Sequence, residues 1–170
     1  MIIRLLTEQD IPAIAALHIA VWQSAYAGIM PGNFLASMDV EERAQKWRKN
    51  FELYKNEAKR DTLIALHKDN LMGFVSYGPA RDTGREDWLE IYALNIHPDY
   101  WGQGIGYALF REAKQKLLAL GANQTYLWVL AKNTRALDAY SRWGGQQEDR
   151  RKTIDIGGAQ LEEISIFFKL

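Results

Sequence analysis

Apolar residues in the first part of the chain change from strand-like to helix-like spacing. The run Ile2–Leu6 is short and β-prone, so it predicts a strand. From Ile11 to Trp22 the apolar residues recur every three or four positions, which predicts a helix with Asp10 as its N-cap. A break rich in glycine and proline at 28–32 ends this helix. A second helix, with one charged and one aromatic face, is predicted to start near residue 38 or 39.

From residue 61 onward the pattern becomes that of a sheet. Thr62–Leu66 and Leu71–Tyr77 predict two antiparallel strands, because the polar residues Lys68–Asn70 between them favour a tight turn. After a polar loop, Trp88–Ile96 predicts a third strand. Pro98 ends it, since proline has no N–H to donate to a neighbouring strand.

The second half of the chain alternates between helices and strands. Helices are predicted at Tyr107–Leu120 and Asn133–Trp143, with a strand at Thr125–Ala131 between them. Lys152–Ile156 and Leu161–Lys169 flank a glycine-containing turn and predict a closing hairpin. No linker or repeat interrupts the pattern. The sequence therefore predicts one mixed α/β domain over residues 1–170.

Composition excludes several classes of function. Lys and Arg together number 21, as do Asp and Glu, so no basic excess favours nucleic-acid or anionic-membrane binding. The chain has no cysteine, which excludes thiol catalysis, disulfides and cysteine-ligated metals. The three histidines lack metal-ligand spacing, and no apolar run is long enough for a membrane span. We expect a cytoplasmic protein with no metal, no nucleic-acid partner and no membrane partner.

The most informative stretch is a strand that leads into glycines at alternate positions and then a helix. Gly102, Gly104 and Gly106 allow backbone N–H groups to surround an anion at the helix N-terminus, which favours phosphate or pyrophosphate binding. The Walker pattern is absent. The dinucleotide fingerprint also fails, because Tyr107 and Leu109 occupy its last position in the two frames. A tight turn without a ligand is the alternative.

Two motifs in register resemble those of a known family. Pro98-x-Tyr100-x-Gly102-Gln103-Gly104-Ile105-Gly106, followed by Ala108-Leu109, resembles the acetyl-CoA-binding motif of the GCN5-related N-acetyltransferase superfamily. Asn133-x-x-Ala136-x-x-x-Tyr140 resembles a second motif of that family. The order of elements also matches, and the chain resembles a bacterial subgroup of unassigned substrate. The resemblance implies a mixed, mostly antiparallel sheet of about seven strands with about four helices. Its fourth and fifth strands would splay to form the cofactor cleft.

The resemblance also implies a set of residues that hold acetyl-CoA. They are Leu94, Asn95 and Ile96 on the fourth strand, the loop residues Gly102, Gln103, Gly104, Ile105, Gly106 and Tyr107, and Asn133. Asn133 has a second interpretation as a helix N-cap. Trp101 departs from the family pattern, where glutamine or arginine is usual, so one side-chain contact is expected to be lost.

Two residues match catalytic positions of the family. Tyr140 corresponds to the general acid that protonates the thiolate leaving group. The alternative is that it packs one face of its helix. Glu90 corresponds to a frequent general base, and strict alternation would place it on one strand face with Tyr92, Leu94 and Ile96. A carboxylate exposed at a strand edge is the alternative for Glu90.

The acceptor end is less sharply defined. Trp22 and Tyr26 are four residues apart on one helical face and could line an acceptor site, or they could belong to the core. The resemblance predicts acetyl transfer from acetyl-CoA to a primary amine on a small molecule, by direct attack in a ternary complex. A protein or peptide amine, or a non-catalytic acyl-CoA sensor, are the alternatives. Homodimers are frequent in the family, so the resemblance implies a homodimer as one expected assembly of this chain.

Overall fold

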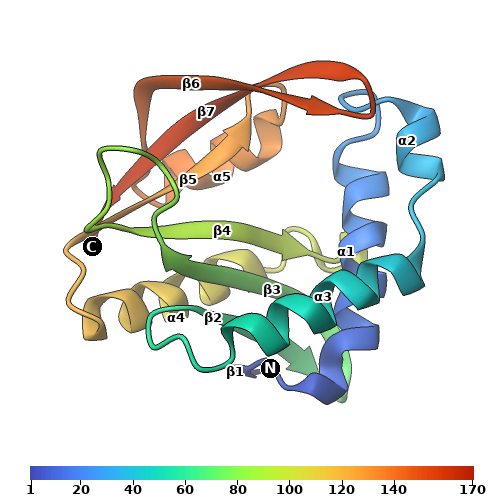
Figure 1. Cartoon of the computed structure of the whole chain (residues 1–170), viewed down its shortest axis with the longest axis horizontal. Coiled ribbons are helices and arrows are strands. Elements are labelled where there is room, and N and C mark those ends of the chain that lie inside the picture. The colour runs from blue at the N-terminus through green and yellow to red at the C-terminus, as the bar shows by residue number, and fades with distance from the viewer.

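The computed structural model describes residues 1–170 and contains one seven-stranded sheet of order β1-β2-β3-β4-β5-β7-β6 (Figure 1). The strands are β1 (Ile2–Leu5), β2 (Asp61–His67), β3 (Asn70–Pro79), β4 (Leu89–Ile96), β5 (Gln124–Leu130), β6 (Gln146–Ile156) and β7 (Ala159–Lys169). The helices are α1 (Ile11–Ala25), α2 (Gly32–Ala36), α3 (Val40–Tyr54), α4 (Ile105–Ala119) and α5 (Thr134–Arg142). Two 3₁₀ turns, η1 (Glu8–Asp10) and η2 (Pro98–Tyr100), precede α1 and α4. None of the helices combines the length and apolar content that a membrane span requires.

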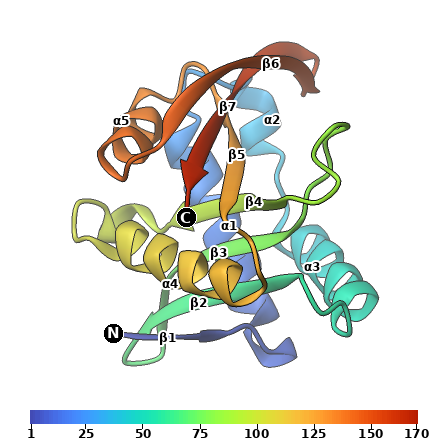
Figure 2. The ribbon, with the colours of Figure 1, turned by 90° about the vertical axis from the view of Figure 1, so that its left-hand side faces the viewer.

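Helices cover both faces of the half-sheet β1 to β4. α4 packs on one face and α1 on the other, with α3 packed against α1 (Figure 2). Alternation along β2 supplies both cores: Leu63 packs with Leu109 of α4, whereas the adjacent Ile64 packs with Ile14 of α1. Burial of each such side chain stabilises the fold by roughly 1.5–3 kcal/mol. The remaining strands, β5, β7 and β6, form the other half of the sheet.

β4 and β5 are the parallel pair in an otherwise antiparallel sheet, and they pair over a short stretch. Leu89–Ile91 pairs with Thr125–Leu127, although β4 continues to Ile96 and β5 to Leu130. Opposite β3, the register of β4 shifts at Tyr92, which is a bulged residue. The two strands therefore diverge beyond their first residues. This arrangement confirms the predicted fold class and the predicted splay.

Most predicted elements are confirmed, and the structure has five α-helices where about four were expected. The short helix α2 begins at the end of the predicted break, with Pro31 as its N-cap residue. α4 begins at Ile105, two residues before the predicted start, since Gly104 takes a left-handed conformation as its N-cap. β6 begins at Gln146 rather than at Lys152. Its first residues are polar or charged and show no apolar alternation, so pairing with β7 defines them.

Asp10 occupies the predicted N-cap position of α1, but its side chain does not cap that helix. The carboxylate accepts from the Arg4 guanidinium at 2.7 and 2.8 Å and from the backbone N–H of Thr7 at 2.8 Å. It thereby ties β1 to the turn η1. At α3, by contrast, Asp39 accepts from the backbone N–H of Glu42 and is a true N-cap.

Candidate active site

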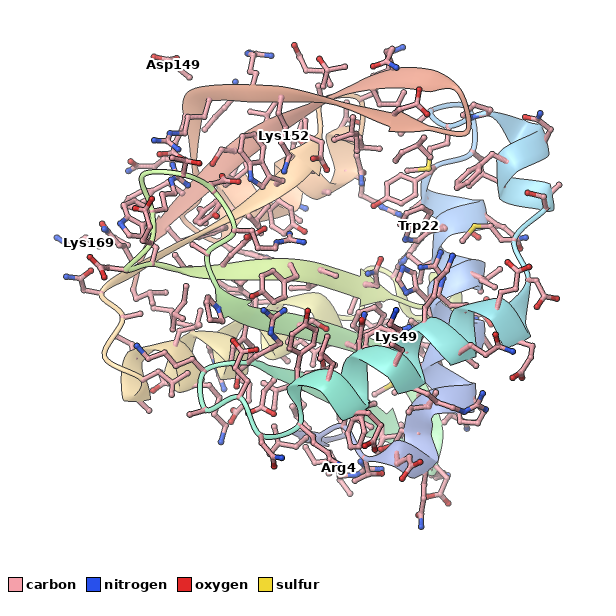
Figure 3. The ribbon with its side chains drawn as sticks, viewed as in Figure 1. Arg4, Trp22, Lys49, Asp149, Lys152 and Lys169 are labelled. Carbon is pink, nitrogen blue, oxygen red and sulfur yellow. The ribbon has the colours of Figure 1, made fainter.

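The divergence of β4 and β5 opens a cavity of about 640 Å³. Its wall is formed by α1, by the diverging parts of β4 and β5, by the start of α4 and by α5. Trp22, labelled on α1 in Figure 3, belongs to this wall and lies beside the gap between the two strands. The volume falls within the range of about 300–1,000 Å³ that is usual for small-molecule sites.

The glycine loop brings a row of free backbone donors to one end of this cavity. The N–H groups from Gly102 to Tyr107 donate to no backbone carbonyl, because the first internal bond of α4 runs from Ala108 to Gly104. Gly104 has a φ of 79°, which side chains other than glycine rarely tolerate. At Gly106 a β-carbon would lie 3.2 Å from the Trp143 ring. Together with the helix dipole, these donors fit the phosphates of acetyl-CoA.

All but one of the predicted cofactor-binding residues lie on the cavity wall. They are Leu94, Asn95, Ile96, Gly102, Gly104, Ile105, Gly106, Tyr107 and Asn133. Gln103 does not line the cavity, because its side-chain amide turns back and donates to the Asp99 carbonyl at 3.0 Å. Asn133 also accepts from the backbone N–H of Ala136 at 3.2 Å, so its interpretation as the N-cap of α5 is confirmed.

Tyr140 lies on the same wall with an unpaired hydroxyl. Its ring packs edge-on to Trp143 with 5.5 Å between centroids, and the residue is 8% exposed. Every fully buried polar side-chain atom in the chain has a hydrogen-bond partner. The Tyr140 hydroxyl makes no such bond, so it opens to the cavity. Burial raises the pKa of Tyr140 above its ordinary value, and the phenol therefore holds its proton at neutral pH.

His18 is the one histidine on the wall. The Trp47 indole N–H donates to its Nδ1 at 3.3 Å, which leaves the ring proton on Nε2. Burial is the main cause that lowers the pKa of His18 to about 3, and the positive charge of Arg43 lowers it further. The imidazole is neutral at pH 7 and poorly suited to accept a proton from an amine.

The comparison with known protein families agrees with this geometry. Residues 22–145, which are more than half of the chain, match the acetyltransferase (GNAT) family. The chain belongs to the GNAT acetyltransferase family. An uncharacterized N-acetyltransferase of Bacillus subtilis, YuaI, is 27% identical over 161 residues, covering 93% of this chain and 87% of the relative. A spermidine N(1)-acetyltransferase of Thermoplasma acidophilum is 24% identical over 149 residues, covering 86% and 89%.

A solved structure shares the whole fold. The PaiA N-acetyltransferase of Thermoplasma acidophilum, in complex with coenzyme A, superposes with a TM-score of 0.81 at 22% identity, over 99% of this chain and 98% of that one. The predicted family and the predicted N-acetyltransferase activity are confirmed. This GNAT acetyltransferase is an enzyme that uses acetyl-CoA, and its free loop donors and cavity fit that cosubstrate.

In this GNAT acetyltransferase Glu90 does not lie on the cavity wall. It is 1% exposed, and its carboxylate accepts from the backbone and guanidinium of Arg81 and from the Tyr126 hydroxyl at 3.2 Å. The alternative of a solvent-exposed carboxylate is therefore wrong. These donors occupy both oxygens, which leaves Glu90 poorly placed to take a proton from an acceptor directly.

The predicted shared face of Glu90, Leu94 and Ile96 is also wrong. Ile91 points into the core beneath α4, so Glu90 points to the opposite face. The bulge at Tyr92 then resets the alternation, and Leu94 and Ile96 pack on the α4 side. A bulge inserts one residue, which reverses the face of every residue beyond it.

The predicted acceptor residues Trp22 and Tyr26 both line the cavity, and they also pack together edge-on with 5.4 Å between centroids. They contact the apolar group around Met30 as well, so the core interpretation is confirmed, and their role in acceptor binding stays a prediction. Burial raises the pKa of Tyr26, and the negative charge of Glu163 raises it further. Glu163 lines the same cavity as Tyr26.

Sequence reasoning missed all three charged residues of the wall, Glu163, Arg135 and Arg142. Glu163 on β7 is the one carboxylate that lines the cavity, and the Lys152 ammonium lies 3.4 Å from it. Nothing in the sequence distinguishes it from the adjacent Glu162. Arg135 in the first turn of α5 also lines the cavity. Its position two residues after the motif asparagine, Asn133, is a signal that could have identified it.

Proposed function

We propose that this enzyme transfers the acetyl group of acetyl-CoA to a primary amine of a small molecule, with both substrates bound at once. One observation carries the proposal: the unpaired Tyr140 hydroxyl faces the same cavity as the free N–H groups of Gly102 and of residues 104–107. The absence of cysteine removes the usual thiol carrier of an acetyl group and favours direct attack by the amine.

Each residue has a role that its surroundings support. Acetyl-CoA, when bound, supplies an acetyl thioester and a thiolate leaving group. The loop N–H groups hold its phosphates, and Tyr140 donates a proton to the leaving group. Glu163 is assigned to receive the proton that the amine must lose, since no other carboxylate lines the cavity. Glu90 is assigned to hold Arg81 and Tyr126 in place rather than to touch a substrate.

A small acceptor is favoured over a protein or peptide amine by the shape of the site. Beside the cavity that holds the acetyl-CoA residues lies an adjoining cavity of about 480 Å³, a size that suits a small molecule. A relative named for spermidine acetylation, a small amine, agrees with this choice. Tyr140 and Glu163 argue against a sensor without turnover, because a binding module needs neither a proton donor nor an acceptor.

The proposal is tested by thermal shift with acetyl-CoA and by thiol release against amino acids, polyamines, aminoglycosides and short peptides. We expect a shift that follows ligand concentration, and thiol release that depends on a small amine. Release with peptides alone would favour the protein-acetylating alternative. A shift without release from any amine would favour the sensor. No shift would contradict the cofactor assignment.

The expected homodimer and the expected cytoplasmic location do not depend on the geometry of the site, and both stay predictions. The family resemblance includes homodimers, which sedimentation of the purified chain would show. The cytoplasmic location would be shown by fractionation of the source cells.

A further inference from the structure

A second cavity adjoins the first. It is about 480 Å³ and lies between α3 and the neighbouring face of β2, β3 and β4. His18, Tyr92 and Ala93 line both cavities, so the two meet at the bulge of β4. A molecule in the second cavity can therefore reach the point where β4 and β5 diverge, beside Trp22 and Tyr26.

The charge on the wall of this second cavity is strongly one-sided. Its ionised groups are one carboxylate, Asp61, and five cations, namely Arg43, Lys46, Lys55, Arg60 and Arg81. Three of the cations have partners within the chain: Lys55 pairs with Glu52, Arg60 with Glu57, and Arg81 with Glu90. His18 adds no charge at neutral pH.

Arg43 and Lys46 form neither a salt bridge nor a side-chain hydrogen bond, although every other cation of the wall does. They are three residues apart on α3, so they lie on one face of that helix. The Arg43 guanidinium is half-buried and lies 5.4 Å from the centre of the Trp22 ring. Trp22 lines the first cavity, so this free cation lies close to where the two cavities meet.

A half-buried cation without a partner loses hydration and gains no counter-charge. Burial lowers the pKa of Arg43, which reflects that cost. An anionic group on a bound molecule would supply the missing partner, with the short, strong hydrogen bonds that guanidinium forms with carboxylate and phosphate.

We propose that the second cavity binds an anionic group of the acceptor, so that the substrate is an amine that also carries a carboxylate or a phosphate. The proposal rests on the proposed function and specifies its substrate class. It separates this enzyme from its spermidine-acetylating relative, because a polyamine would bring further ammonium groups against Arg43 and Lys46.

Matched pairs of amines test the proposal, with binding to the enzyme–CoA complex measured by calorimetry and acetylation measured by thiol release. The pairs are L-lysine with cadaverine, and phosphoethanolamine with ethanolamine, and spermidine is a fifth probe. The variants are Arg43→Gln and Lys46→Gln, with Lys49→Gln as the control on the same helix. Lys49, labelled in Figure 3, is exposed and does not line the cavity.

We expect at least one anionic amine to bind about ten- to a hundredfold more tightly than its partner, as charged hydrogen bonds allow. Arg43→Gln should remove most of this preference without weakening acetyl-CoA binding, and Lys49→Gln should leave both unchanged. The two pairs distinguish a carboxylate from a phosphate. Equal binding within both pairs, tighter binding of spermidine, or no detectable binding of either anionic amine would overturn the proposal. Binding with the expected preference but no thiol release would retain the anion site and contradict the proposed reaction.

Discussion

The guanidinium carbon of Arg135 lies 3.1 Å from the centre of the Trp101 ring. Arg135 comes from α5 and Trp101 from the start of the glycine loop, so this stack joins the two walls of the cavity. Trp101 is itself fixed, because its indole N–H donates to the Ile96 carbonyl at 2.7 Å. Trp101 stands where the family usually has glutamine or arginine. We infer that Arg135 supplies from α5 a positive charge that this position lacks.

Arg135→Gln should therefore weaken acetyl-CoA binding by roughly ten- to a hundredfold, the value of a charged hydrogen bond. Calorimetry with acetyl-CoA measures the change. Arg111→Gln, at an exposed position on α4 away from the cavity, is the control and should bind normally. Equal affinity in the two variants would show that Arg135 does not contact the cofactor.

Tyr140→Phe should lower kcat by about 10²–10⁴-fold and leave the dissociation constant of acetyl-CoA within about twofold, because it removes a proton donor and little volume. Burial raises the pKa of Tyr140, so the wild-type donor should stay protonated, and active, to a pH above the ordinary range of tyrosine. A kcat–pH profile measures both effects. Full activity of the variant at every pH would rule out Tyr140 as the acid.

Gly104→Ala should weaken acetyl-CoA binding, because an alanine resists the φ of 79° that orients the loop N–H groups. Gly121→Ala is the matched control: its φ is 87°, and no atom crowds a β-carbon at either position. Both variants should lose about 1–2 kcal/mol of stability. A cofactor affinity reduced equally in both would mean that general destabilisation, rather than the loop, is responsible.

Glu163→Gln should reduce kcat by about a hundredfold near neutral pH if its carboxylate receives the amine proton. The deficit should shrink as the pH rises, because more of the amine is then already unprotonated. Glu162→Gln, one residue away and exposed on the same strand, should retain activity.

Glu90→Gln should mainly lower the free energy of unfolding, since it leaves the cation of Arg81 without its buried partner. If kcat fell further in Glu90→Gln than in Glu163→Gln, and if that loss depended on pH, the two assigned roles would be reversed.

His18 should make the stability of the protein fall between neutral and mildly acidic pH. Its pKa is about 3 in the folded state and 6.5 in the unfolded chain, so the unfolded state binds the proton first. The contribution is complete above about pH 6.5 and declines below it, by about 2 kcal/mol between pH 7 and pH 5. Urea unfolding at the two pH values should show this loss in the wild type and in His67→Gln, whose imidazole is exposed. His18→Gln should not show it.

Contiguous features of the site were predictable from the sequence. The loop Gly102–Tyr107 follows a strand and opens a helix, and backbone N–H groups at such a helix start are free wherever the rest of the chain lies. Asn133 and Tyr140 are seven residues apart on one helix, so local geometry places both along the same wall. For these residues the sequence alone determined the local placement.

Features that depend on pairing between distant segments were decided only by the tertiary structure. The bulge at Tyr92 arises from the register of β4 against β3, and it reversed the faces predicted from simple alternation beyond Glu90. Glu163 reaches the first cavity because β7 pairs with β5. Arg43 reaches the second cavity because α3 packs beside the sheet. Residue type alone does not distinguish the carboxylates of Glu90, Glu162 and Glu163. Strand register and helix packing determined which carboxylate became buried, which stayed in solvent and which faces the cavity.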